Sequence, residues 1–122
     1  MKVAVLGVSD NPGRYAYLAV QRLRAQGHEV IGVNPRLPDL DDVYVVASLA
    51  EVPSDVDTLT VYLAPANSAP LADELCNLPV RRVIFNPGSE SPMLAKRLAG
   101  RGVKVLEACT LVLLATGRFE DV

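Results

Sequence analysis

The chain contains little of the chemistry from which metal sites, disulfide frameworks and catalytic triads are built. It has one histidine, His28, and two cysteines, Cys76 and Cys109, which form no Cys-x-x-Cys pattern. Zinc sites and disulfide frameworks need closely spaced sets of such residues, so the sequence indicates neither, and we expect no metal site. No catalytic triad is visible. His28 follows Gly27 and is expected to be a solvated residue at a helix end.

An excess of one charge and long apolar runs are also missing. The 12 Lys and Arg residues stand against 14 Asp and Glu residues, and the two signs are interspersed. Nonspecific nucleic-acid binding requires a basic face, so nucleic acid is not an expected partner. No stretch approaches the ~20 apolar residues that span a bilayer, and no cleavage pattern follows the apolar start of the chain. We therefore expect a cytoplasmic protein without a membrane partner.

The sequence does show a regular alternation of short apolar runs with segments of helical period. The predicted strands are residues 2–6, 29–33, 57–63, 81–85 and 103–106, with a short edge strand at 43–46. The predicted helices are 14–26, capped by Asn11 and Pro12, then 66–78, 92–98, capped by Ser91, and 109–115. These βαβ units predict one domain over residues 1–122.

The predicted fold class is α/β, a doubly wound, Rossmann-like parallel sheet of about five strands in three α/β/α layers. The simplest order of the strands in the sheet is 3-2-1-4-5. Ligands of such folds bind beyond the carboxyl ends of the strands, where the order reverses. That point lies between the first strand and the strand at 57–63.

The turn after the first strand carries the main functional signal. Gly7 lets the backbone approach a phosphate, while the following helix directs its free N–H groups and positive dipole end toward it. Arg14 can add a charge-assisted contact, and Ser9 can donate its hydroxyl. Of the dinucleotide pattern G-x-G-x-x-G only the first glycine is present, because Ser9 and Pro12 occupy the other two positions. A turn that only packs the first helix on the sheet is the alternative.

The end of the second strand argues against NAD. Asn34 stands where the acidic residue that binds the ribose of NAD is expected, and Arg36 follows it. This exchange leaves room for an additional phosphate. Coenzyme A carries such a phosphate on its ribose.

The run G-V-S-D-N-P-G-R-Y-A-Y at 7–17, with V-N-P at 33–35, F-N-P-G at 85–88 and E-A-C at 107–109, resembles the small bacterial and archaeal CoA-binding proteins. These are similar to the nucleotide-binding domain of succinyl-CoA synthetase α subunits and of NDP-forming acyl-CoA synthetases. The resemblance covers nearly the whole chain. It implies a Rossmann-like domain that binds CoA without a demonstrated reaction of its own.

Carried over by motif position, the resemblance implies four groups of site residues. At the pyrophosphate they are Gly7, Val8 and Ser9, with Arg14 as the cation and Tyr17 nearby. Beside the adenosine and its 3′-phosphate they are Asn34, Pro35 and Arg36; on the adenine side Leu63, Ala64, Pro65 and Asn67; and on the pantetheine path Asn86, Pro87 and Gly88. Cys109 is expected to be a packing residue, with a mixed disulfide to CoA as the alternative.

The hypothesis that follows is a module that binds coenzyme A or an acyl-CoA and acts as a carrier, a sensor or a partner subunit without evident catalysis. The alternatives are an NAD(P)-binding reductase, a CoA-ligase component that works with another chain, and an interaction scaffold with a vestigial pocket. A homodimer or another protein partner stays open.

Overall fold

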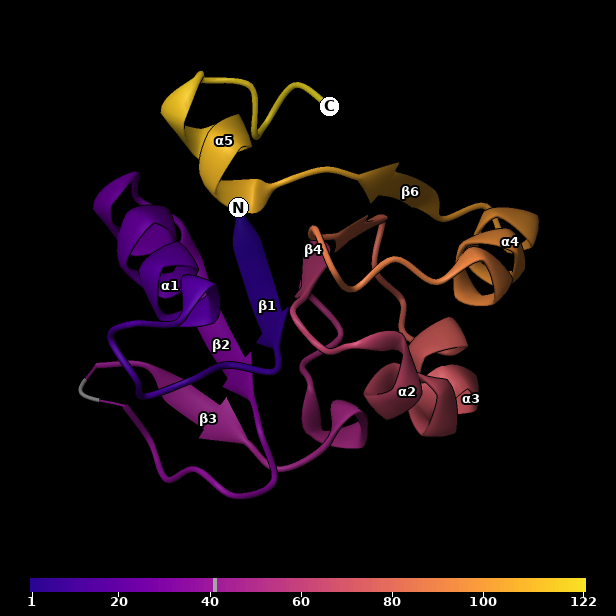
Figure 1. The fold of residues 1–122 in the computed structure, drawn as a ribbon, viewed down its shortest axis with the longest axis horizontal. Helices are drawn as coiled ribbons and strands as arrows, with labels where there is room; N and C mark the ends of the chain where they lie inside the picture. Colours follow the sequence, from indigo (N-terminus) through magenta and orange to yellow (C-terminus); the bar gives the residue numbers. More distant parts are fainter. Residues whose placement is uncertain (41) are drawn as a thin grey trace.

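The computed structural model describes residues 1–40 and 42–122 and shows an all-parallel sheet with helices on both faces (Figure 1). Within these residues the sheet has six strands in the order β3-β2-β1-β4-β5-β6. They are β1 (Lys2–Leu6), β2 (Glu29–Val33), β3 (Tyr44–Val46), β4 (Thr58–Val61), β5 (Arg82–Phe85) and β6 (Lys104–Glu107). The doubly wound fold is confirmed, with six strands rather than about five, because the short edge strand forms. The order reverses between β1 and β4, as predicted.

The two faces of the sheet are covered by different helices. The helices are α1 (Tyr15–Ala25), α2 (Pro65–Ser68), α3 (Ala72–Cys76), α4 (Pro92–Gly100) and α5 (Thr110–Ala115), with 3₁₀ turns at Leu49–Glu51 and Ala69–Leu71. On one face Val3 and Val5 of β1 pack in a core with residues of α1 and α5. On the other face Ala4 and Leu6 pack in a core with residues of α3 and α4. Successive side chains of a strand point to opposite faces, so β1 serves both cores.

Two helix predictions need correction. The helix expected over 66–78 is interrupted by the 3₁₀ turn Ala69–Leu71. Pro70 lies in this turn, and a proline has no N–H with which to continue a helix. The helix expected from residue 14 begins at Tyr15, and its N-cap residue is Arg14 rather than Asn11. Asn11 instead accepts the Gly13 amide on its side-chain oxygen at 2.9 Å, which makes a turn before the helix. The predicted cap of α4 is confirmed, since Ser91 accepts the Leu94 amide.

The edge of the sheet at β3 is partly occupied by its own loop. The Asp39 carboxylate accepts the backbone amide of Val45 at 2.8 Å, and Leu40 forms an isolated bridge with Val43. An unpaired edge amide would otherwise be available to another chain. Asp41, in the loop between β2 and β3, lies outside the described residues.

The amino ends of the strands are closed by the C-terminal segment. Arg82, fully buried, donates to the carbonyls of Phe119 and Val122 and lies 4.6 Å from the centre of the Phe119 ring. His28, predicted to be solvated, is only 6% exposed. Its Nδ1 lies 3.0 Å from the N-terminal ammonium of Met1, and its ring packs edge-on against Phe119. These contacts lie at the end of the sheet opposite to the carboxyl ends of the strands.

No helix in the described part of the chain is both long and apolar enough to cross a membrane.

Candidate functional site

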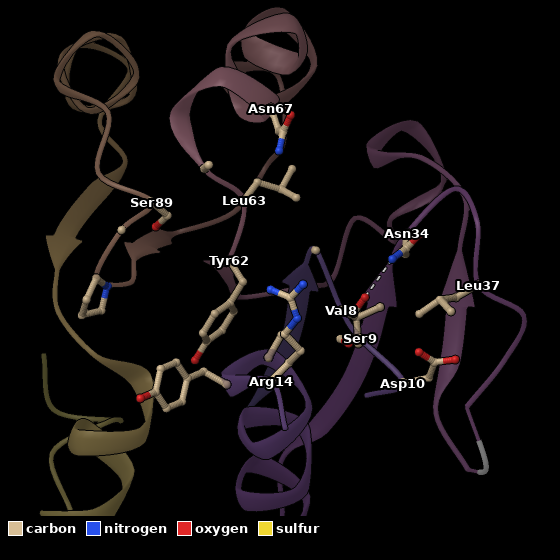
Figure 2. A pocket seen from close by; sticks show the side chains of 16 residues that line it. Val8, Ser9, Asp10, Arg14, Asn34, Leu37, Tyr62, Leu63, Asn67 and Ser89 are labelled. Atoms are coloured by element: carbon tan, nitrogen blue, oxygen red, sulfur yellow. Dashed lines mark hydrogen bonds between the residues drawn. The ribbon is translucent and has the colours of Figure 1, made fainter. Parts of the chain in front are cut away.

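A cleft of about 550 Å³ opens at the carboxyl ends of the strands, where the strand order reverses (Figure 2). We call it the phosphate cleft, after the group that the sequence analysis expects at the Gly7 turn. Four connections line it: the turn between β1 and α1, the end of β2, the turn between β4 and α2, and the turn between β5 and α4. This is where ligands bind in open α/β sheets, because the connections diverge on either side of the reversal and leave a crevice.

The turn after β1 is tight at position 7 and has a backbone conformation that favours glycine. Gly7 has a φ of +86°, and a Cβ at this position would lie 2.9 Å from Cδ2 of Leu63. The Gly7 amide is held by the Val33 carbonyl at 3.0 Å. Arg14, at the end of the turn, is exposed and lines the cleft. Backbone and a guanidinium group therefore face the same space just before α1, an arrangement that suits an anion.

The Asn34 side chain connects the turn after β1 to the turn after β2. Its side-chain Nδ2 donates to the Val8 carbonyl at 2.9 Å, and its Oδ1 accepts the Arg36 amide at 2.9 Å. Both polar atoms of the side chain thus contact protein. Gly32 completes the contact, because a Cβ there would lie 2.7 Å from Cγ1 of Val8. The sequence analysis missed Gly32, although a glycine inside a strand indicates close approach by another part of the chain.

A second cleft of about 550 Å³ adjoins the first. We call it the nucleoside cleft, after the group that the sequence analysis expects beside Asn34, Pro35 and Arg36. The two clefts share Gly7, Asn34, Leu63 and Asn67. The residues that line only the nucleoside cleft are Leu6, Val33, Pro35, Arg36, Ala47, Ser48, Leu49, Leu71 and Glu74. Ser48 and Glu74 were not predicted, because no motif marks a polar residue of a loop or helix as part of a distant cleft.

Most of the predicted site residues come together in these two clefts. The phosphate cleft contains Gly7, Val8, Ser9, Arg14, Asn34, Leu63, Ala64, Asn67, Pro87 and Gly88. The nucleoside cleft adds Pro35 and Arg36. Ser9 accepts the Asn11 amide on its hydroxyl oxygen at 3.0 Å, which leaves its hydrogen free to donate.

Three predicted residues line neither of the two clefts as the described residues define them. Tyr17 lines a smaller cavity of about 260 Å³ with Val20 and Leu40, whereas Tyr15, 72% exposed, lines the phosphate cleft. Residues two apart on a helix point in different directions, so Tyr15 and Tyr17 cannot both face the cleft. Pro65 is the exposed first residue of α2 and lines neither cleft as the described residues define them.

Asn86 is the third, and its role is structural. The side chain is buried, its Nδ2 donates to Thr60 Oγ1 at 2.6 Å and to the Val61 carbonyl at 2.9 Å, and its Oδ1 accepts the Thr110 amide at 2.8 Å. It therefore joins β4, β5 and α5 beside the cleft. Ser89, three residues later, lines the phosphate cleft, and its hydroxyl donates to the carbonyls of Val61 and Asn86.

Tyr62 is a further residue of the cleft that the sequence analysis missed. It follows β4 directly, it lines the phosphate cleft, and its hydroxyl is buried. Burial raises the pKa of the Tyr62 hydroxyl above its ordinary value, because a phenolate is poorly solvated there. Cys109, the N-cap residue of α5, is a partly exposed free thiol. No group of three His, Cys, Asp or Glu residues suited to a metal ion occurs within residues 1–40 and 42–122.

Comparison with known proteins gives matches over much of the chain. The model of the CoA binding domain family matches residues 1–115. The uncharacterized protein YneT of Bacillus subtilis is 30% identical over 73 residues, which are 60% of this chain and 54% of that protein, so the match spans about half the length of the relative.

Solved structures are similar over a larger share of the chain. A crystal structure of an uncharacterized protein is 36% identical, with a TM-score of 0.90 over 97% of both chains. The dinucleotide forming acetyl-coenzyme A synthetase 1 of Ca. Korarchaeum cryptofilum is 20% identical, with a TM-score of 0.74. That match covers 88% of this chain and 25% of the synthetase, and it shows a shared fold.

Proposed function

The chain belongs to the CoA-binding domain family, and from this premise we propose that it binds coenzyme A or an acyl-CoA through the turn between β1 and α1 and the neighbouring loops. One observation carries the proposal. The Gly7 turn lies where the two clefts meet, so a pyrophosphate there has space on both sides. CoA needs this arrangement, because its pyrophosphate lies between a nucleoside and a long pantetheine arm.

The pyrophosphate fits the Gly7 turn for electrostatic reasons. The first amides of a helix have no partners inside the helix, and the helix dipole adds positive potential at that end. α1 is 11 residues long and starts immediately after Arg14. Arg14 takes part in none of the ion pairs formed among the described residues, so its charge is available to the ligand.

The nucleoside cleft suits the adenosine end. Leu49, Leu63 and Leu71 supply apolar surface against which a flat base can pack. Arg36 lines the same cleft and forms no ion pair with another described residue. We assign it to the 3′-phosphate of the ribose, a group that NAD lacks.

The pantetheine arm follows the phosphate cleft away from the nucleoside. Pro87, Gly88 and Ser89 line this cleft and none of them lines the nucleoside cleft. In the view of Figure 2, Ser89 and Tyr62 lie across Arg14 from Ser9 and Leu37. An arm that starts at the pyrophosphate and passes Tyr62 ends at residues 87–89.

For the role of the bound CoA we propose a carrier, a sensor or a partner subunit rather than an enzyme. Catalysis on a thioester uses an activated nucleophile or a general base at the ligand. The single histidine, His28, is engaged with Met1 and Phe119 at the opposite end of the sheet. The reductase alternative is less well supported, because Asn34 occupies the ribose position and is bonded to Val8 and Arg36.

Isothermal titration of the ligand-free protein tests the proposal. The titrants are CoA, 3′-dephospho-CoA, NAD and NADP, in one buffer at one ionic strength. We expect CoA to bind more tightly than 3′-dephospho-CoA, and both to bind more tightly than NAD or NADP. A preference for NADP would favour the reductase, and no binding by any of the four would favour a scaffold with a vestigial pocket.

A further inference from the structure

Tyr15 is the most exposed large hydrophobic residue in the part of the chain that the structure describes. It is 72% exposed, more than Tyr44, Val112, Met93 or Met1. Of these five residues, Tyr15 alone lines the phosphate cleft, and none of the five lines the nucleoside cleft. An apolar ring at the wall of a cleft loses water when a ligand covers it, and this burial stabilises the complex.

The start of α1 places Tyr15 beside the cation of the site. Tyr15 is the first residue of the helix and follows Arg14 directly. The Leu18 amide donates to the Arg14 carbonyl at 3.2 Å, so the first helical turn fixes the backbone at this point. Arg14 is the residue that we assign to the pyrophosphate, and the pantetheine arm of CoA begins at the pyrophosphate. Tyr15 is therefore next to the first groups of the arm.

The phosphate contacts alone do not distinguish CoA from shorter nucleotides. Arg14 is assigned to the pyrophosphate and Arg36 to the 3′-phosphate, and both groups also occur in 3′-phosphoadenosine 5′-diphosphate, which is CoA without its arm. The nucleoside cleft would hold the same adenosine in either ligand. Selection of CoA over such nucleotides therefore requires a contact with the arm itself.

The arm side of the phosphate cleft offers an uncharged surface. Pro87, Gly88 and Ser89 line it together with Tyr62. The Ser89 hydroxyl already donates to two carbonyls, those of Val61 and Asn86. The pantetheine arm is uncharged and carries methyl and methylene groups, which pack well against a flat aromatic face. Tyr15 provides such a face, and its exposure leaves the ring accessible to a ligand.

We propose that the Tyr15 ring packs against the pantetheine arm and makes the site selective for nucleotides that carry this arm. CoA and its thioesters then bind in preference to 3′-phosphoadenosine nucleotides without the arm. The proposal rests on the proposed function and deepens it, because it names the side chain that separates CoA from ligands with the same phosphates. Tyr15 is a specificity-determining residue and takes part in no reaction.

A pair of ligands with and without the arm tests the proposal. The titrants are CoA and 3′-phosphoadenosine 5′-diphosphate, and each variant is compared with the wild-type protein on the same ligand. Tyr15→Ala should weaken the binding of CoA about five- to twentyfold, the effect of losing roughly 40–70 Å² of apolar contact. The affinity for 3′-phosphoadenosine 5′-diphosphate should be unchanged, because this ligand has no arm to contact the ring.

Two further variants serve as controls. Tyr15→Phe keeps the ring and removes the hydroxyl, so it should bind CoA as tightly as the wild type does. Tyr44→Ala removes an exposed tyrosine of β3 that lines neither cleft, so it should change neither affinity. Tyr15→Ala should fold normally, since Tyr15 is exposed at the start of a helix and alanine is a good helix former. Denaturation in urea checks the fold of each variant.

Three results would overturn the proposal. An unchanged CoA affinity in Tyr15→Ala would show that the ring is a solvated surface group. Equal losses for both ligands would place the ring against the nucleotide that they share. A loss in Tyr15→Phe as large as that in Tyr15→Ala would assign the contact to the hydroxyl. If the wild-type protein binds neither ligand, the proposed function fails as well, whereas the first three results leave it intact.

Discussion

The side-chain amide of Asn34 donates a hydrogen bond to the backbone carbonyl of Val8 at 2.9 Å, and the oxygen of the same amide accepts the Arg36 amide. The turn that faces the proposed pyrophosphate and the turn that carries Arg36 are thereby joined through one side chain. Resemblance to CoA-binding proteins placed Asn34 beside the adenosine as a ligand contact. The structure shows it as a link between two turns that both line the proposed site.

Asn34→Ala should weaken CoA binding without removing a charged contact. The substitution leaves both turns less ordered, so part of the free energy of CoA binding is used to order them. We also expect a loss of about 1–2 kcal/mol in the free energy of unfolding, since one partly buried and one exposed hydrogen bond disappear. Titration with CoA and denaturation in urea measure the two effects. CoA affinity equal to that of the wild type would show that the turns keep their positions without Asn34.

Arg14→Ala should weaken the binding of CoA by about 1.5–3 kcal/mol, the usual range for a hydrogen bond to a charged group. The loss should be the same for 3′-dephospho-CoA, because both ligands carry the pyrophosphate. Arg36→Ala is the matched variant and should affect CoA much more than 3′-dephospho-CoA. Titration of each variant with both ligands separates the two phosphate positions. If Arg14→Ala affects only CoA, the assignment of the two arginines must be exchanged.

Gly7→Ala should destabilise the protein more than Gly27→Ala does. The two glycines have φ values of +86° and +88°, so both substitutions place alanine in a conformation that costs about 1–2 kcal/mol. At Gly27 a Cβ meets nothing within 4 Å, whereas at Gly7 it lies 2.9 Å from Leu63. The difference between the two unfolding free energies in urea therefore measures the contact alone. Equal losses would mean that Leu63 moves aside freely.

Acidification should destabilise the fold through His28. Burial lowers the pKa of His28 below its ordinary value of 6.5, and the N-terminal ammonium acts in the same direction. The unfolded chain therefore binds this proton more readily than the folded chain. Stability is present above the unfolded-state pKa and is lost as the pH falls below about 6.5 toward the folded-state value. Unfolding free energies measured in urea from neutral pH downward should show this slope.

His28→Asn should reduce the slope in that pH range, because asparagine does not titrate. Asp57 provides an internal contrast. Its hydrogen bond with Arg81 lowers the pKa of its carboxyl below 3.8, so its contribution is lost only at more acidic pH. A slope that is unchanged in His28→Asn would assign the pH dependence to another group.

The sequence was sufficient for features that depend on neighbouring residues. The alternation of strands and helices, the reversal beside β1 and the glycine turn before Arg14 all follow from local patterns. The break at Pro70 was equally local, and a proline inside a helical pattern was the available signal. The start of the first helix was predicted without weighing how the Asn11 side chain binds a nearby backbone amide instead of capping the helix.

The features that escaped prediction are contacts between distant parts of the chain. His28 is buried because Met1 and Phe119 pack against it, and no spacing within the sequence predicts this contact. Asn86 looked like a ligand contact because it follows a strand at the binding edge, yet the side chain is buried and its amide is bonded to Thr60, Val61 and Thr110. For Tyr62 there was no pattern at all, since its place in the cleft is evident only once the neighbouring elements are placed.

The close packing of Gly32 against Val8 constrains how this protein can diverge. A methyl group at position 32 would meet the Val8 side chain at 2.7 Å, and the carbonyl of Val8 is the one that Asn34 holds. Position 32 cannot accept a larger residue while the Val8 side chain stays where it is. We therefore expect homologous sequences to vary at positions 8 and 32 together, with a small residue at 8 wherever 32 is not glycine. Substitutions in the second strand and in the first turn are therefore expected to occur together.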